Sequence, residues 1–147
     1  MRVSDLHARF ARLAALVAAP NDLPLDHWFC LYEHAIAAQP DLLLEVGRGY
    51  GNSTVVLTEA AHALRARVVS VGFDEPPAFE NSTWPKLAPA LGDSWRAPLT
   101  VIQGDVRDYL PPSCERCFLF WDAHGPEVAD AMLGRLIPAL PIGSSCR

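Results

Sequence analysis

The sequence has few cysteines and no long apolar run, and each absence excludes a class of protein. Its four cysteines are scattered over 147 residues, so they do not provide a disulfide framework, and this usage is typical of the reducing cytosol. No stretch approaches the roughly 20 apolar residues that a helix needs to span a bilayer. We therefore expect a cytoplasmic protein without a membrane-spanning segment.

Positive charge is scarce as well. The chain has 12 Lys and Arg residues against 17 Asp and Glu residues, which gives a formal net charge of -5. Proteins that bind nucleic acids or anionic membranes depend on attraction between basic side chains and phosphates, and this balance of charge opposes it. The composition favours a small molecule as the partner, with no nucleic acid and no membrane.

The first 40 residues have the pattern of two helices. Apolar residues recur at three- and four-residue spacing over residues 4–19 and again over residues 24–39, and a proline ends each segment. Half of the chain is hydrophobic, which is enough for one core at this length. We expect residues 1–40 to form a helical flank and residues 41–147 to form one α/β domain.

The pattern changes after residue 40 to short apolar runs separated by helical stretches. The runs cover residues 42–46, 68–71, 99–102 and 117–121, with helical segments at 53–64 and 127–140. Because the runs are continuously apolar rather than alternating, both faces of the strands should be covered, as in a parallel sheet. This predicts an α/β fold with a Rossmann-like parallel sheet after two N-terminal helices. Residues 75–98 contain five prolines, so we expect a loop there with a short helical turn at 86–91.

A glycine-rich turn follows the first apolar run. Its sequence is Gly47-Arg48-Gly49-Tyr50-Gly51-Asn52-Ser53, and a helix begins at once. Glycines allow the backbone to bend with positive φ and let a ligand approach closely, while the first amides of the helix have no helical acceptor. Strand, turn and helix in this order predict a site for a nucleotide-like ligand at the carboxyl ends of the strands.

The spacing of the glycines decides between ligands. A dinucleotide-binding turn needs glycine at its first, third and sixth positions, but the sixth position here is Asn52. A phosphate-binding P-loop needs Gly-Lys-Ser/Thr, which the turn lacks. The pattern Glu-x-Gly-x-Gly-x-Gly from Glu45 to Gly51 resembles the first motif of class I S-adenosylmethionine (SAM)-dependent methyltransferases, in which the turn wraps the methionine part of the cofactor.

Two further segments support this resemblance, in the order that the family has them. Residues 101–105, Val-Ile-Gln-Gly-Asp, resemble the family's third strand, whose final acid, here Asp105, lies near the adenine. Residues 117–125 resemble the motif at the substrate end of the site, in a Trp-Asp-Ala-His-Gly version. The resemblance covers about residues 40–140 and implies a SAM site. Its predicted cofactor-binding residues are Glu45, Gly47, Gly49, Gly51, Asn52, Ser53, Asp74 and Asp105.

The second strand departs from the family's pattern. That strand usually ends with an acid that holds the ribose hydroxyls of the cofactor, and Gly72 stands at this place here. Asp74 lies two residues further and would face the same side if the chain stays extended, since side chains alternate along a strand. Asp74 is therefore the predicted substitute, and we expect weakened affinity for the cofactor.

Asp122 and His124 follow the fourth apolar run and are the predicted catalytic residues. Two polar side chains two positions apart can face one cleft and serve as a base or a metal ligand. In the branch of the family that includes catechol O-methyltransferase-like enzymes, the acid at the place of Asp122 resembles a Mg²⁺ ligand, and further oxygen ligands come from the next strand. Local hydrogen bonding is the alternative role for His124, and capping of nearby amides is the alternative for Glu45 and Asp105.

The resemblance also implies an incomplete sheet. Sheets of the family have seven strands in the order 3-2-1-4-5-7-6, and the matched portion provides strands one to four, in the order 3-2-1-4. We interpret the chain as truncated after the fourth strand. Residues 117–121 would then form an apolar sheet edge, through which the chain could self-associate.

The predicted function is SAM-dependent methyl transfer to an unidentified small-molecule acceptor, assisted by Mg²⁺ if the metal-dependent branch applies. The alternative is a catalytically inactive methyltransferase-like module for binding or interaction, because Gly72 and the missing strands reduce the capacity for turnover. Nicotinamide-dependent oxidoreduction is disfavoured, since Asn52 breaks its glycine spacing and Gly72 replaces the ribose-binding acid that it also needs.

Overall fold

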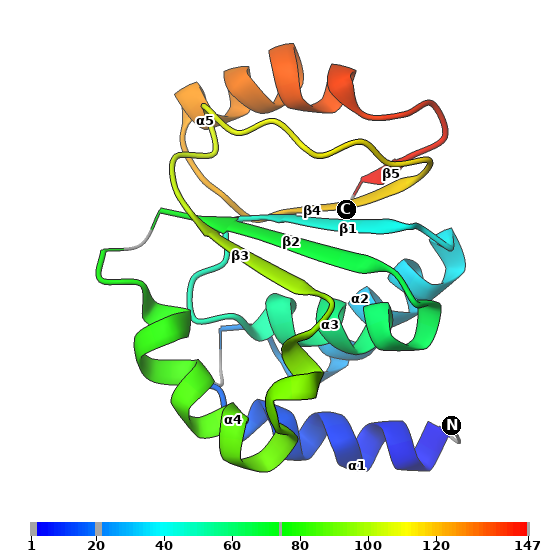
Figure 1. Cartoon of the computed structure of the whole chain (residues 1–147), viewed down its shortest axis with the longest axis vertical. Helices are drawn as coiled ribbons and strands as arrows, with labels where there is room; N and C mark the ends of the chain where they lie inside the picture. Colours follow the sequence, from blue (N-terminus) through cyan, green and yellow to red (C-terminus); the bar gives the residue numbers. More distant parts are fainter. Residues whose placement is uncertain (1–2, 20–21, 74, 147) are drawn as a thin grey trace.

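The computed structural model describes residues 3–19, 22–73 and 75–146, and its centre is a parallel sheet of five strands (Figure 1). The strands are β1 (Leu42–Val46), β2 (Arg67–Gly72), β3 (Leu99–Gln103), β4 (Cys117–Trp121) and β5 (Ser145–Cys146). Their order across the sheet is β3-β2-β1-β4-β5, and every neighbouring pair is parallel. The predicted α/β class and the order 3-2-1-4 are therefore confirmed.

Helices cover both faces of the sheet. The α-helices are α1 (Val3–Ala14), α2 (Leu25–Ala38), α3 (Asn52–Leu64), α4 (Trp84–Leu91) and α5 (Pro126–Ala131). Figure 1 shows α3 against one face with α1 and α4 beneath it, and α5 over the opposite face. The two predicted N-terminal helices are present, although α1 ends before the expected residue 19. In the described part of the chain, no helix is long and apolar enough to cross a membrane.

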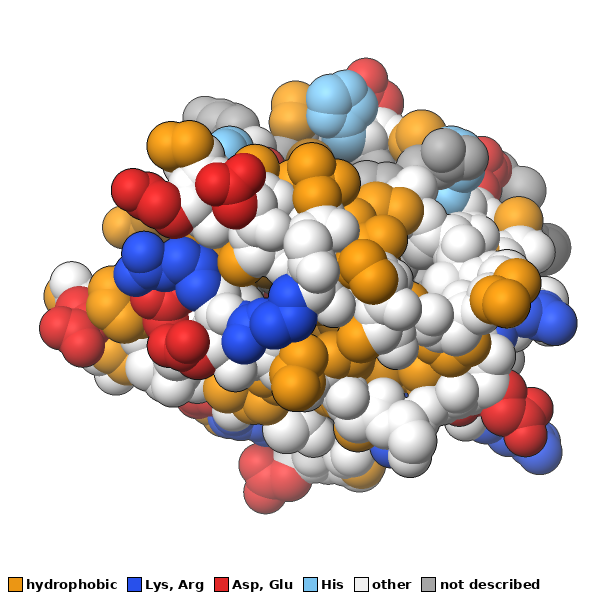
Figure 2. Space-filling view, turned by 90° about the horizontal axis from the view of Figure 1, so that it is seen from above, with side chains coloured by type: hydrophobic (Ala, Val, Ile, Leu, Met, Phe, Trp, Pro, Cys, Tyr) orange, Lys and Arg blue, Asp and Glu red, His pale blue; other side chains and the backbone are white. Residues whose placement is uncertain are grey.

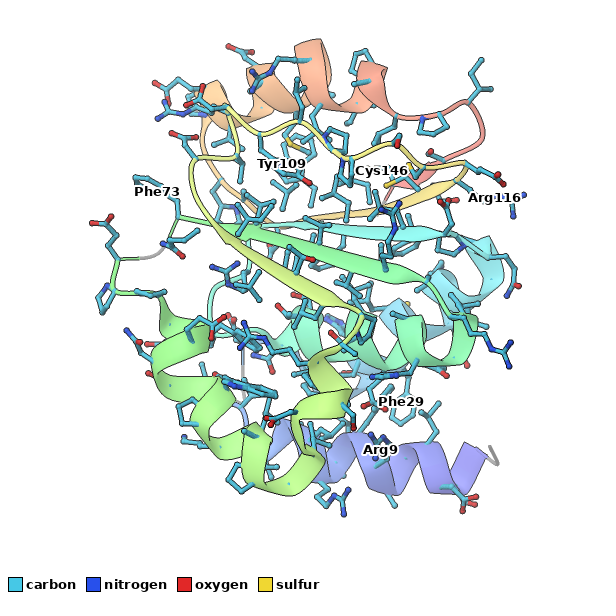
Figure 3. The ribbon with its side chains drawn as sticks, in the orientation of Figure 1. Arg9, Phe29, Phe73, Tyr109, Arg116 and Cys146 are labelled. Atoms are coloured by element: carbon cyan, nitrogen blue, oxygen red, sulfur yellow. The ribbon has the colours of Figure 1, made fainter. Side chains whose placement is uncertain are left out.

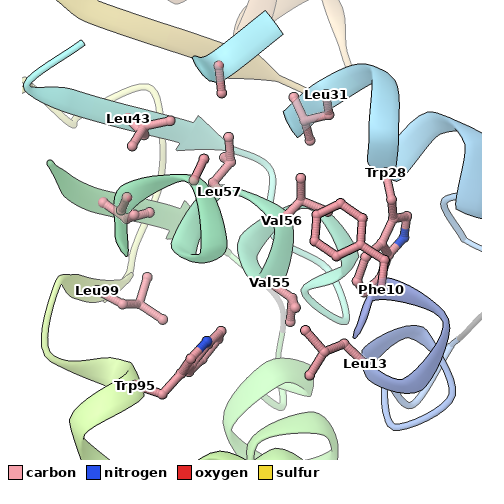
Figure 4. Packing of buried hydrophobic residues seen from close by; sticks show 14 of the residues in the cluster. Phe10, Leu13, Trp28, Leu31, Leu43, Val55, Val56, Leu57, Trp95 and Leu99 are labelled. Atoms are coloured by element: carbon pink, nitrogen blue, oxygen red, sulfur yellow. The ribbon is translucent and has the colours of Figure 1, made fainter. Parts of the chain in front are cut away.

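The strands alternate their side chains between two cores. Leu43 and Phe118 face the layer of α1, α2 and α3, where Phe10 and Trp28 pack edge to face with ring centroids 5.7 Å apart (Figure 4). Leu44 points to the opposite face of the sheet and belongs to a second cluster of buried residues, which packs against the layer of α5. Because Phe10 is fully buried in the same cluster as the strand residues, the N-terminal helices share the core of the sheet.

Two predicted segments differ from the structure for reasons that proline explains. The expected loop 75–98 is mostly helical: a π-helical turn at Phe79–Thr83 runs directly into α4, whose first turn accommodates Pro85 because an N–H there has no helical acceptor. The expected helix 127–140 is broken into α5, a π-helical turn and a 3₁₀ turn that contains Pro138. A proline cannot donate the hydrogen bond that a continuing α-helix requires.

The sheet does not end at β4, and this corrects the expectation of four strands. β5 pairs with the first part of β4, with Phe118 opposite Ser145 and Leu119 opposite Cys146. Two residues of mixed polarity give no recognisable strand pattern, so the sequence analysis missed β5. In the described residues, the pairing leaves Phe120 and Trp121 without a strand neighbour on this side.

We expect the isolated chain to self-associate, because the part of β4 that β5 does not cover is apolar. Light scattering should give a mass above the 16.1 kDa of one chain, and a dye that fluoresces on apolar surfaces should bind. A stable monomer that leaves the dye silent would contradict this prediction.

Candidate functional site

The glycine turn lies at the carboxyl ends of β1 and β4, and two of its glycines are required by sterics. Gly47 has φ +97°, and a Cβ built on it would lie 2.6 Å from the backbone nitrogen of Ala123 and from the carbonyl carbon of Asp122. Gly51 has φ +90°, and its Cβ would strike the ring of Phe79. Both positions combine a backbone conformation that favours glycine with a space that no side chain fits.

Glu45 lies beneath the turn, and its carboxyl group is fully buried. It accepts hydrogen bonds from the hydroxyls of Ser53 at 2.5 Å, Thr54 at 2.6 Å and Ser70. Burial raises the pKa of Glu45, and the three hydroxyls and the nearby Arg48 oppose that shift. The carboxyl thus fastens the first turn of α3 to β1 and β2.

Arg48 is the residue of the turn that the sequence analysis did not anticipate. Its side chain is 2% exposed. Nη1 donates to the carbonyl oxygens of Ser70 at 2.9 Å and Ile102 at 3.1 Å, and Nη2 donates to Oε1 of Gln103 at 2.9 Å. The guanidinium therefore joins the turn to the carboxyl ends of β2 and β3. No spacing rule marks this role, because the position after the first glycine accepts any residue in the motif.

A cavity of about 540 Å³ opens beside the turn, within the size range of small-molecule sites. Seven of the predicted residues line it: Gly47, Gly49, Asn52, Ser53, Asp105, Asp122 and His124. Glu45 and Gly51 do not line it, and Asp74 lies outside the described residues. Phe73 is a lining residue that the sequence analysis missed, and Figure 3 shows it just beyond the carboxyl end of β2.

Asp105 is placed in the cavity by its own turn. Its Oδ1 accepts a hydrogen bond from the backbone N–H of Arg107 at 2.8 Å, and both carboxylate oxygens bind the Arg107 guanidinium. These bonds lower the pKa of Asp105 to about 2, so the group is a carboxylate at neutral pH. Asp105 therefore accepts the local hydrogen bond that was the alternative to a cofactor role. Its side chain also lines the cavity.

Asp122 and His124 lie on the loop between β4 and α5. The amide of Asp122 donates to the carbonyl oxygen of Val46 at 2.8 Å, which ties this loop to the end of β1. Nε2 of His124 is 3.9 Å from Oδ1 of Asp122, and the two side chains are 89% and 60% exposed. The pair stands at the solvent side of the cavity, where a ligand can reach it.

The described residues provide only part of a possible Mg²⁺ site. They contain no group of three or more His, Cys, Asp and Glu side chains arranged to hold a metal ion. Mg²⁺ prefers about six oxygen ligands in octahedral geometry, and Asp122 offers one exposed carboxylate with an imidazole beside it. Mg²⁺ usually keeps several waters and takes one or two carboxylates, so a single Asp122 carboxylate does not exclude it, and Mg²⁺ stays a prediction.

The lining of the cavity is acidic. It includes the carboxylates of Asp22, Asp105, Asp122 and Glu127 against the guanidiniums of Arg48 and Arg107. Figure 2, seen from above, shows acidic and basic side chains gathered at the left end of the molecule, where β1, β2 and β3 finish in Figure 1. A cavity with an excess of carboxylates favours a ligand that carries positive charge.

A second cavity adjoins the first. It has a volume of about 290 Å³ and shares Leu23 and Phe120 with the first cavity. Its other walls are His27, Cys30, Leu31 and His34, which recur at three- and four-residue spacing along α2. The two cavities together offer a charged space beside the glycine turn and a more apolar space next to it.

Solved structures of methyltransferases have a similar fold. The SAH-bound Podospora anserina methyltransferase PaMTH1 matches over 92% of this chain and 57% of its own length, with 15% identity and a TM-score of 0.65. TomG, an O-methyltransferase of Streptomyces achromogenes in complex with SAM, matches over 86% and 60%, with 19% identity and a TM-score of 0.59. An O-methyltransferase of Bacillus cereus in complex with SAH matches over 79% and 54%, with 19% identity and a TM-score of 0.56. No protein-family model and no curated protein matches the sequence.

The chain has the fold of class I SAM-dependent methyltransferases, as the resemblance of its motifs implied. It spans a little over half the length of PaMTH1 and of the Bacillus cereus enzyme.

Proposed function

We propose that the chain binds SAM in the cavity beside the glycine turn and forms the cofactor-binding part of a methyltransferase for a small-molecule acceptor. This proposal rests mainly on the close contact at Gly47. There β1, the glycine turn and the loop after β4 meet so closely that no side chain fits. Methyltransferases solved with SAM or SAH have the same fold.

The charge of the cavity supports SAM over a dinucleotide. SAM carries a sulfonium, an ammonium and a carboxylate group and is a net cation, whereas NAD carries an anionic pyrophosphate and is a net anion. Four carboxylates and two guanidiniums line the cavity, so the balance of charge attracts the first ligand and repels the second. Asp105 is held as a carboxylate at neutral pH, which maintains this balance.

The residues of the chain fit SAM at two of its three parts. The glycine turn gives the methionine part close access to the backbone, and Asp105 with the nearly buried Val106 borders the space for the adenine. At the place of the ribose-binding acid, however, β2 ends with Gly72. When bound, SAM supplies an electrophilic methyl group.

The chain's own contribution to transfer would be mostly positioning. Asp122 and His124 stand at the rim where an acceptor hydroxyl can meet the cavity, and either can take up its proton. The adjoining cavity, with Leu31 and Phe120 in its walls, suits an acceptor that has an apolar part. Since the described residues contain no complete set of metal ligands, we derive no metal-assisted step.

An inactive binding module is the second candidate, and the end of β2 favours it. Gly72 has no carboxylate to hold the ribose hydroxyls, and the buried side chain of Arg48 lies next to it. Such a chain would keep the fold and bind the cofactor weakly or not at all.

Calorimetry with SAM, S-adenosylhomocysteine (SAH) and NAD tests the proposal. We expect SAM and SAH to bind through the glycine turn, and NAD not to bind, because the excess of carboxylates in the cavity repels its pyrophosphate. Binding of none of the three would favour the inactive module, and binding of NAD alone would refute the proposal. Where SAM binds, Asp122→Asn and His124→Gln variants that keep its affinity but lose methyl transfer would assign the proton acceptor.

A further inference from the structure

Asn52 has a buried oxygen atom without a hydrogen-bond partner, at the wall of the cavity beside the glycine turn. Asn52 is 2% exposed and lines that cavity. Its Nδ2 donates to the carbonyl oxygen of Ala19 at 2.8 Å, which fixes the orientation of the amide. Among the residues that the structure describes, no group donates to Oδ1. Because buried polar atoms nearly always have partners, this oxygen indicates a ligand that donates a hydrogen bond.

Asp22 reaches the same wall of the cavity from the N-terminal helical flank. Its backbone N–H donates to the carbonyl oxygen of Ala19 at 3.2 Å, so Asp22 and the amide of Asn52 share one acceptor and lie close together. Asp22 lines the cavity, and its Oδ2 would lie 3.8 Å from a Cβ built on Gly49. Within the described part of the chain, no basic side chain forms an ion pair with this carboxylate. A carboxylate and an amide oxygen therefore lie next to each other beside the glycine turn.

The segment that carries this carboxylate is fastened at both of its ends. Before it, the amide of Ala18 donates to Oγ1 of Thr83 at 3.3 Å, and that hydroxyl donates to the carbonyl oxygen of Tyr50 in the turn at 2.7 Å. After it, the carbonyl oxygen of Leu23 accepts a hydrogen bond from Nε1 of Trp28 at 3.0 Å. These bonds join the flank to the glycine turn, so the flank contributes directly to the wall of the cavity.

We infer that Asp22 and Asn52 bind the amino group of the cofactor and make the site specific for a ligand that carries this group. The inference rests on the proposed function, because it assigns residues to one part of SAM in the same cavity. The protonated amino group is a cation with three N–H donors, so it can satisfy the carboxylate and the amide oxygen together. The ribose hydroxyls and the adenine amine are neutral donors, which would leave the carboxylate without an opposite charge.

Calorimetry with SAH and desamino-SAH, the analogue in which hydrogen replaces the amino group, tests this inference on the whole chain. Neither ligand has a sulfonium, so the comparison isolates the amino group. We expect the wild type to prefer SAH by at least about tenfold, because hydrogen bonds between charged groups are stronger than neutral ones. A smaller preference overturns the inference alone, since SAH then binds as proposed. Absence of binding of SAH overturns both the inference and the proposed function.

Asp22→Asn is the main variant, since it removes the charge but keeps the shape of an exposed side chain. Its affinity for SAH should fall by about tenfold, because the amino group loses a charged partner. Its affinity for desamino-SAH should not fall, since that ligand has no cation to lose a partner. A loss in equal proportion for both ligands would indicate a structural role and overturn the inference. Tighter binding of SAH would place Asp22 against the carboxylate of the cofactor, which also overturns it.

Two control variants separate a direct contact from the general charge of the cavity. They are needed because desamino-SAH is more negative than SAH, so any nearby carboxylate could disfavour it. Glu127→Gln removes another carboxylate from the lining of the cavity, and Asp26→Asn removes one from the first turn of α2, outside that lining. At about 0.15 M salt, exposed charges more than about 8 Å apart are largely screened, so neither variant should change the ratio of affinities. A fall in either as large as that in Asp22→Asn would overturn the inference.

Asn52→Ala tests the second residue of the pair. This variant removes the unpartnered oxygen together with the hydrogen bond to Ala19, and the preference for SAH over desamino-SAH should fall in it as well. A ratio of affinities equal to that of the wild type would overturn the assignment of Oδ1 to the amino group. Thermal unfolding without ligand shows whether this buried substitution destabilises the chain. If it does, Asp22→Asn keeps the inference testable, because that side chain is exposed.

Discussion

A Gly47→Ala variant is expected to lose about 3–5 kcal/mol of unfolding free energy, enough to unfold many small domains. The added Cβ would lie 2.6 Å from the backbone of Asp122 and Ala123, at a φ of +97° that alanine rarely adopts. A flexible side chain could rotate away from such a contact, but these are backbone atoms. Asp122 is moreover hydrogen-bonded to Val46, so the loop cannot retreat without breaking the end of the sheet.

Gly49→Ala is the matched control for this prediction. The two glycines belong to the same turn, but the nearest atom to a Cβ on Gly49 is Oδ2 of Asp22, at 3.8 Å. Its φ of +49° lies in the left-handed region, which costs an alanine roughly 1–2 kcal/mol. Urea denaturation of both variants measures the difference. Equal losses would show that backbone conformation, rather than the close approach of the loop, makes Gly47 necessary.

Glu45→Ala is expected to cost about 3–5 kcal/mol as well, for a different reason. The hydroxyls of Ser53, Thr54 and Ser70 would lose a shared acceptor inside the core, and each such loss costs about 1 kcal/mol or more. Deleting the side chain also leaves a cavity under the turn, because the site is fully buried. Thermal or urea unfolding measures the loss.

Glu45→Gln separates the hydrogen bonds from the charge. The amide keeps one acceptor oxygen and nearly the same shape, so its cost should be clearly smaller than that of alanine. Because burial raises the pKa of Glu45, its contribution is fully present below the unfolded-state pKa and is lost as the pH rises through the folded-state value. The stability of Glu45→Gln relative to the wild type should therefore increase with pH above about 4. A difference that does not vary with pH would contradict the raised pKa.

Patterns of apolar residues predicted the sheet because β1, most of β2 and the first part of β4 are continuous buried runs. Residues 42–46 and 117–121 form central strands that are covered on both faces. Apart from Glu45, their sequences are therefore apolar throughout, which is the pattern that predicts a buried parallel strand. β5 could not be predicted, since two residues of a loop-like segment form a strand through their pairing with Phe118 and Leu119. Such a strand depends on tertiary pairing, which no local pattern contains.

Some residues of the candidate site could likewise be predicted from the sequence, and others could not. The glycines and the polar residues after β3 and β4 could be placed at one edge of the sheet, because the carboxyl ends of parallel strands meet there. The role of Arg48 could not, since it depends on three acceptors from β2 and β3. The sequence shows the glycine at position 72 but not the Arg48 side chain that lies 3.1–3.2 Å from a Cβ built there. The separation of Glu45 from the cavity likewise depends on burial.

The contact at Gly47 joins the two sides of the cavity through main-chain atoms. The turn that would hold a methyl donor and the loop that would face an acceptor have no side chain between them to act as an adjustable spacer. Their separation is fixed by the peptide geometry of Gly47, Asp122 and Ala123. If the chain binds an acceptor as proposed, a change of acceptor preference is expected to come from side chains rather than from movement of the loop, because the loop cannot move and keep the turn intact.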